Sequence, residues 1–215
     1  MANLIIKPST GGQLILKDEG DSAAITVATN GAVTIAGNVT LSGAGNVYGV
    51  GTFPTGHIVQ VVQTVKTDFF TSTAINNNFV AITGLTCEIT PARTSNKILV
   101  NVSVNYGTSV YAGFLKIQHN GSGSYADVSG AVGTANGSMT PMTMGNLGGT
   151  ADSAETMNSA VTFLDSPSKD SAFTYRIMGS ARHDTTWYIN SPQDRTDQSY
   201  TGLGISTITL MEVSA

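Results

Sequence analysis

The segment from Arg182 to Tyr200 holds the residue types that could bind a ligand at the protein surface. A Trp or Tyr ring suits the apolar face of a sugar, and Asp, Asn, Gln and Arg suit its hydroxyl groups. Aromatic side chains are also efficient in subunit contacts, and an ordinary strand would place one ring in the core and the next in solvent. These three alternatives stay open for the candidate binding residues, which are Arg182, Asp184, Trp187, Tyr188, Asn190, Gln193, Asp194, Arg195 and Tyr200.

Catalytic and metal-binding patterns are absent from the sequence. His57, His119 and His183 have no nucleophile motif such as Gly-x-Ser-x-Gly near them, so we expect surface or interface histidines. There is no His-x-His, no Cys-x-x-Cys and no Asp-rich calcium loop. The pair Asp194 and Asp197 is typical of a solvated polar loop. The sequence therefore predicts no catalytic residue, no metal, no cofactor and no enzyme activity.

The composition narrows the classes of partner. Only 11% of the residues are charged, against roughly 25% in typical soluble domains. The net charge of −4 is spread along the chain without a basic patch, which argues against nucleic acid, and no apolar run is long enough for membrane insertion. The single cysteine, Cys87, alternates with Leu85 and Ile89, so we expect a small buried side chain there.

An apolar-Thr-apolar triplet recurs near the N-terminus, with Leu14-Ile15-Leu16 as a looser copy upstream. In a strand, residues two apart point to the same side, so each triplet presents two apolar side chains on one face. Such a strip must stack on its own repeats or on identical chains. We therefore expect a β-repeat shaft, as an intertwined homotrimer or a short β-solenoid, with these residues inside: Ile25, Val27, Val33, Ile35, Val39 and Leu41.

The rest of the chain is typical of half-buried strands joined by turns. Residues 1–50 are the expected shaft and attachment segment, residues 51–57 a Gly/Pro linker, and residues 58–215 a head. Strands are expected at 58–65, in two runs within 79–90 divided at Gly84, at 98–105, 115–118, 187–190 and 205–213, and in a hairpin of 160–164 with 173–178. Weak strands and a long loop are expected over 121–158. The sequence predicts an all-β fold whose head is an antiparallel, jelly-roll-like β-sandwich.

Several stretches also carry a family resemblance. Met1–Pro8 and Lys17–Ala24 resemble the start of fibre-like virion proteins of marine tailed bacteriophages, and Phe53–Val62 is similar to their shaft-to-head junction. Phe163–Pro167 followed by Tyr175, and Ser206–Val213, look like parts of their head domain. The resemblance implies a virion appendage, usually trimeric, with a β-rich head. Fifty extended residues reach no more than roughly 165 Å, so a short capsid or collar fibre, or the distal piece of a longer tail fibre, is expected.

These observations lead to a structural function in the virion. The expected protein is a trimeric phage fibre whose head attaches to a host surface glycan or envelope protein by many weak contacts. Its N-terminal segment would bind other virion proteins. With no recognisable signal peptide, it would be made in the host cytoplasm. A capsid fibre or decoration protein without receptor binding is the alternative, and a polysaccharide depolymerase comes third.

Overall fold

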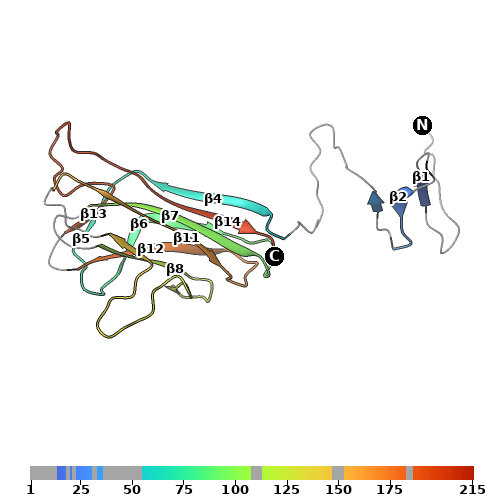
Figure 1. Ribbon diagram of the computed structural model, residues 1–215, viewed down its shortest axis with the longest axis horizontal. Helices are drawn as coiled ribbons and strands as arrows, with labels where there is room; N and C mark the ends of the chain where they lie inside the picture. The colour runs from blue at the N-terminus through green and yellow to red at the C-terminus, as the bar shows by residue number, and fades with distance from the viewer. Residues whose placement is uncertain are drawn as a thin grey trace. The chain divides into compact units, whose positions relative to one another are not determined.

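The computed structural model describes residues 14–17, 20, 23–30, 33–35, 55–107, 113–146, 153–182 and 186–215. Every regular element in these ranges is a β-strand, and all strand pairings within the sheets are antiparallel. The predicted all-β fold is therefore confirmed for this part of the chain. The chain divides into two compact units, Met1–Gly51 and Thr52–Ala215, which are drawn in Figure 1 and described one at a time below.

Unit 1 contains a three-stranded meander of β1 (Leu14–Lys17), β2 (Ala23–Val27) and β3 (Val33–Ile35). The triplets at 14–16, 25–27 and 33–35 thus lie in strands, and these strands pair with one another inside a single chain. Antiparallel pairing distinguishes this sheet from the parallel coils of a β-helix. Two further residues of the expected shaft, Val39 and Leu41, lie outside the described residues.

Unit 2 is built from two antiparallel sheets (Figure 1). The six-stranded sheet consists of β4 (Ile58–Lys66), β5 (Phe70–Ser72), β7 (Lys97–Gly107), β11 (Met157–Asp165), β13 (Trp187–Ile189) and β14 (Ser206–Val213). The five-stranded sheet consists of β6 (Val80–Ile89), β8 (Gly113–His119), β9 (Ala126–Asp127), β10 (Met144–Asn146) and β12 (Phe173–Ala181). The first has the order β4-β14-β7-β13-β5 with β11 on β7, and the second the order β10-β8-β12-β6 with β9 on β8.

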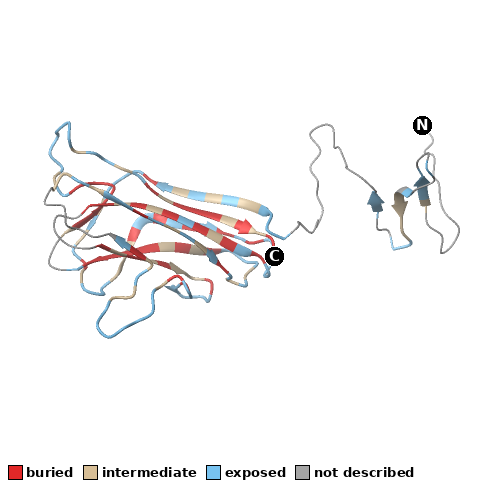
Figure 2. Ribbon diagram, in the orientation of Figure 1, coloured by how far each residue is buried: buried red, intermediate tan, exposed pale blue. Residues whose placement is uncertain are grey.

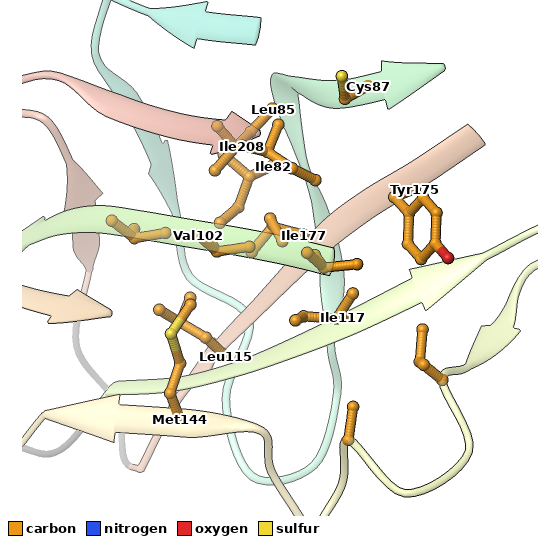
Figure 3. Close-up of a cluster of buried hydrophobic side chains, with 14 of the residues drawn as sticks. Ile82, Leu85, Cys87, Val102, Leu115, Ile117, Met144, Tyr175, Ile177 and Ile208 are labelled. Carbon is orange, nitrogen blue, oxygen red and sulfur yellow. The ribbon is translucent and has the colours of Figure 1, made fainter. Parts of the chain in front are cut away.

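The two sheets of unit 2 share one hydrophobic core (Figure 2). Strand β7 buries every second residue, which follows from the alternation in its sequence. Figure 3 shows its Val102 facing Ile117 and Ile177 of the opposite sheet. Cys87 is buried in this core, as its spacing predicts, and burial raises the pKa of its thiol.

The strands of unit 2 pair in a nested order. The first long strand, β4, pairs with the last, β14, and β6 pairs with β12. Inside these, β7 pairs with β11 and β8 with β10. This is the order that results when one long antiparallel hairpin folds over itself into two layers. It brings β4 and the end of the chain side by side.

The predicted hairpin of 160–164 with 173–178 is wrong. Strand β11 pairs with β7 in the six-stranded sheet, whereas β12 lies between β6 and β8 in the other sheet. The connection of residues 166–172 therefore crosses from one sheet to the other. Its turn residues favour a reversal of the chain, and they carry no information on which strand the next segment joins.

The expected division of residues 79–90 at Gly84 is also wrong. Residues Val80–Ile89 form the single strand β6, and the register against β12 shifts between Arg176 and Met178. Gly84 lies in this bulge with φ of +81°, a conformation that glycine adopts without strain. The glycine thus bends the strand and does not end it.

Candidate functional site

The loop between β13 and β14 is held in place by Asn190. Asn190 has φ of +64°, and its side-chain amide donates to the backbone oxygens of Lys66 and Asp68 at 2.8 and 2.9 Å. Its side-chain oxygen accepts from Ser206 Oγ at 2.6 Å, and its backbone oxygen accepts from Gly204 N at 3.1 Å. The loop therefore starts and ends at nearly the same point, as in an Ω-loop, and the turn after β4 is fixed against it.

These contacts create a cavity of about 350 Å³ between the loop and the turn after β4. Its size lies at the lower end of the range of small-ligand pockets. The cavity is lined by Phe69, Pro192, Asp194, Arg195, Thr196, Asp197, Gln198, Thr201 and Leu203. The wall thus combines a ring, an alkyl group, carboxylates, an amide, hydroxyls and a guanidinium.

Arg195 lies between two rings at this site. Its guanidinium carbon is 4.7 Å from the centroid of Phe69 and 5.3 Å from that of Tyr188. Cation–π attraction holds the guanidinium at both distances. Phe69 remains 52% exposed, and its ring offers an apolar surface beside the charge.

Asp194 is fixed by hydrogen bonds within the loop. Its Oδ1 accepts from the backbone N–H of Thr196 at 3.0 Å and from the Thr196 hydroxyl at 2.8 Å. These bonds hold the pKa of the Asp194 carboxyl below its usual value, so the group is ionised at neutral pH. The Asp194 backbone N–H donates to Ser153 O at 2.8 Å, and the Thr201 hydroxyl lies 2.9 Å from the backbone oxygens of both Thr196 and Gln198.

The structure brings Asp194 and Arg195 into this cavity, as the predicted binding segment requires. Three other predicted binding residues are buried and stabilise the fold. Trp187 is fully buried and its indole N–H donates to Ala74 O at 2.9 Å, while Asn190 is buried beneath the loop. Tyr188 is also buried, although its ring supports Arg195. The prediction that Trp187 and Asn190 contact a ligand is therefore wrong, and so is the alternative that one of the two adjacent rings faces solvent.

The remaining predicted residues do not line the cavity. Gln193 and Tyr200 are exposed elsewhere on the same loop, and Arg182 is exposed just after β12. Asp184 lies outside the described residues, as does His183.

Phe69 was not predicted from the sequence. The signal is present in the pair Phe69-Phe70, since adjacent strand residues point in opposite directions and Phe70 packs on Trp187 with ring centroids 5.5 Å apart. Thr201 and Leu203 join the site only because the loop returns to Asn190, a contact that no local pattern predicts.

A second polar cluster surrounds His119, which is half-buried and not a surface histidine. Its Nδ1 accepts from Gly121 N at 3.0 Å, and its Nε2 lies 3.5 Å from Asp165 Oδ2. The Tyr175 hydroxyl donates to the same Asp165 oxygen at 2.6 Å, and both burial and the Asp165 carboxylate raise the Tyr175 pKa. Both imidazole nitrogens are thereby engaged, and the cluster connects β8, β11 and β12.

Across the described ranges, no group of three or more His, Cys, Asp or Glu residues could hold a metal ion. The same part of the chain contains no helix that could cross a membrane.

Comparison with known proteins does not identify a family for this chain. No protein family model matches the chain, and no curated protein sequence matches it. A chain in the structure of the infectious bursal disease virus Gx strain is similar over 88% of this chain, with 12% identity and a TM-score of 0.36. The match spans 51% of that chain. At this TM-score the likeness supports no inference on function.

Proposed function

We propose that this protein is a short fibre or appendage of a tailed-phage virion that assembles as a homotrimer and attaches to a host surface glycan. Unit 1 joins the copies, and its N-terminal residues bind other virion proteins. Unit 2 is a jelly-roll head that carries the glycan site in the loop between β13 and β14. The resemblance to marine phage fibres supports the virion part of this proposal, and the nested strand order supports the jelly roll.

The observation that carries the proposal is the apolar face of the unit 1 sheet. The register aligns Leu14, Val27 and Val33 in one row across the sheet, and Leu16, Ile25 and Ile35 in a second row on the same face. Thr26 pairs with Thr34 on the opposite face. Within one chain, Leu16, Val33 and Ile35 remain 50%, 60% and 44% exposed.

This face needs a partner. A sheet of three such short strands buries little apolar surface by itself, and covering each half-exposed side chain contributes about 1 kcal/mol. Identical chains supply identical apolar rows at equal concentration. Three copies that share these rows form the hydrophobic core that one copy lacks.

The cavity in unit 2 suits a neutral sugar better than an acidic one. Asp194 and Asp197 outnumber the single cation Arg195, so an acidic ligand would be repelled. Sugar hydroxyls can donate to the carboxylates and accept from Arg195 and Gln198, while Phe69 covers an apolar sugar face. A site of this size gives weak binding, which three linked copies strengthen.

Binding to host cells tests the attachment role. Alanine variants of Arg195 and Asp197 are compared with Arg93→Ala, an exposed arginine in the turn before β7. Arg195→Ala and Asp197→Ala are expected to reduce cell binding by about tenfold, and Arg93→Ala to leave it unchanged. Binding that survives both site variants contradicts the glycan site. Loss of binding after protease treatment of the cells would identify an envelope protein instead, and new reducing ends would identify a depolymerase.

A second experiment tests the assembly of copies. Val33→Asp with Ile35→Asp places charges on the apolar face of β3, and Thr34→Asp places one on its opposite face. The double variant is expected to lose the trimer and to bind cells about a hundredfold more weakly, because avidity is lost. Unit 2 should unfold at an unchanged temperature. If the double variant keeps the mass of three chains, the apolar face does not join the copies.

A further inference from the structure

The outer face of the six-stranded sheet in unit 2 is organised in three cross-strand rows. These side chains point away from the core, since they alternate with the buried Ile98, Val100, Ile208 and Leu210. The pairing of β4, β14, β7 and β11 defines the rows. They are Val61–Met211–Leu99–Leu164, then Gln63–Thr209–Asn101–Thr162, then Val65–Thr207–Ser103–Ala160.

None of these rows contains a charged residue. The first row is apolar throughout, and its end residues Val61 and Leu164 are 55% and 45% exposed in the single chain. In the middle row, the polar groups bond to one another: Gln63 Nε2 donates to Thr209 Oγ1 at 2.7 Å and Asn101 Nδ2 to Thr162 Oγ1 at 2.9 Å. The face therefore exposes apolar groups and few unsatisfied donors.

The outer face of the five-stranded sheet has the opposite character. Strands β6, β8, β9 and β12 carry Glu88, Lys116, Asp127 and Arg176 there. Lys116 Nζ lies 3.0 Å from Asp127 Oδ2, and Arg176 donates to Gln118 Oε1. Charged rows are typical of a sheet face in water, whereas depletion of charge is typical of the centre of an interface.

We infer that the outer face of the six-stranded sheet is a contact between copies of this chain. Lys97, which pairs with Val213 at the start of β7, is exposed at the edge of this face, beside the first row. A second copy is favoured over a different protein because the centre of the face has no charge that a foreign partner could recognise. An identical uncharged surface can cover it without repulsion between like charges. The inference rests on the proposed trimer, whose unit 1 contacts keep the heads at high local concentration.

The size of the face explains why that tethering matters. Four strands spaced by about 4.8 Å and three rows spaced by about 7 Å cover roughly 300–400 Å². A stable interface needs about 800 Å² from each partner. The face alone is therefore too small to hold two free heads together, and it is sufficient for heads that unit 1 already joins.

Thiol labelling of the full chain tests this contact. Leu164→Cys places a thiol on the uncharged face, and Thr86→Cys places one on the charged face of the other sheet. The natural Cys87 is buried and its raised pKa disfavours the reactive thiolate. In the assembled chain, Leu164→Cys should react with a maleimide about tenfold more slowly than Thr86→Cys, since the covered thiol reacts only when the heads separate.

A charge on the same face provides the matched control. Val61→Lys is tolerated by the head because Val61 is exposed, and it should restore fast labelling of Leu164→Cys. Thr86→Lys, on the charged face, should leave the labelling slow. Restoration by Val61→Lys distinguishes a contact between copies from low reactivity of the thiol itself.

The mass of the labelled sample separates the two proposals. Fast labelling of Leu164→Cys in a sample with the mass of three chains overturns the head contact and leaves the proposed trimer standing. The mass of one chain contradicts the proposed trimer. A slowly labelled thiol in such a monomer would mean that the chain covers this face by itself, which also overturns the inference.

Discussion

Trp187 and Asn190 show how the position of a residue, and not its type, decides its role. The Trp187 ring stacks on Tyr106 with centroids 5.5 Å apart and planes 7° apart, inside the core. The Asn190 side-chain amide donates to the backbone oxygens of Lys66 and Asp68, and its oxygen accepts from the Ser206 hydroxyl. Both residues belong to types that bind sugars, and both serve the loop that carries the actual cavity. Residue types alone therefore led to a segment that lines a cavity with Asp194 and Arg195, and they did not show which of its side chains are buried.

Glu212 is the buried carboxylate whose removal should cost most. It is fully buried and accepts from Gln60 Nε2 at 2.6 Å, from Ala92 N at 2.7 Å and from Asn96 Nδ2 at 2.5 Å. Glu212→Ala leaves these buried donors without an acceptor, so the free energy of unfolding should fall by about 3 kcal/mol in a urea titration.

The exposed Glu88 provides the control for this prediction. Glu88→Ala should change the free energy of unfolding by less than about 0.5 kcal/mol, because its carboxylate is in solvent. Equal effects of the two substitutions would show that the Glu212 hydrogen bonds do not stabilise the fold.

The pKa of Asp127 tests the charged face of unit 2. Partial burial raises this pKa, whereas the hydrogen bond from Gln118 and the Lys116 ammonium lower it by more. The pKa of Asp127 is therefore below its usual value. The carboxylate thus adds stability above its unfolded pKa, and this contribution is lost as the pH falls through the folded value. Lys116→Met should raise the Asp127 pKa in an NMR titration. An unchanged value would contradict the ion pair.

At the level of elements, alternation predicts strands well and their partners poorly. Strand β7 follows its period-two pattern closely, and the expected strands at 58–65, 115–118, 187–190 and 205–213 are confirmed with small changes of their ends. The wrongly predicted hairpin of β11 with β12 is an error in strand pairing, not in strand position. Both segments read as adjacent strands, but their partners lie far away in the sequence, and only the shared core selects them.

Gly84 gives a test of the bulge in β6. A Cβ at this position would meet Lys66 Nζ at 3.4 Å, and φ of +81° is strained for any other residue. Gly84→Ala should lower the free energy of unfolding by about 1–2 kcal/mol. Gly202→Ala is the control, because a Cβ there has no neighbour within 4 Å. The bulge account would be contradicted if both variants had wild-type stability.

The sequence predicts the cavity site only in part. Asp194 and Arg195 stand out because a polar loop follows an aromatic strand. Phe69 reaches them through the contact of Asn190 with Lys66 and Asp68, which are more than a hundred positions away. Such a long-range contact depends on how β4, β13 and β14 share one sheet, and no periodicity carries that information.

At the scale of the whole molecule, each unit exposes a sheet face on which uncharged rows lie side by side. In unit 1 this face consists of the two apolar rows on β1, β2 and β3, and in unit 2 of the three rows on β4, β14, β7 and β11. In the proposed trimer, assembly of identical copies would cover both faces and supply the multivalency that weak attachment needs.

The most direct test of this account is the mass of the purified full-length chain in solution, measured by light scattering. The account predicts the mass of three chains, with monomers appearing only after Val33→Asp and Ile35→Asp. The mass of a single chain of 22.2 kDa at all concentrations would contradict it, because the apolar rows of unit 1 would then have no partner copy.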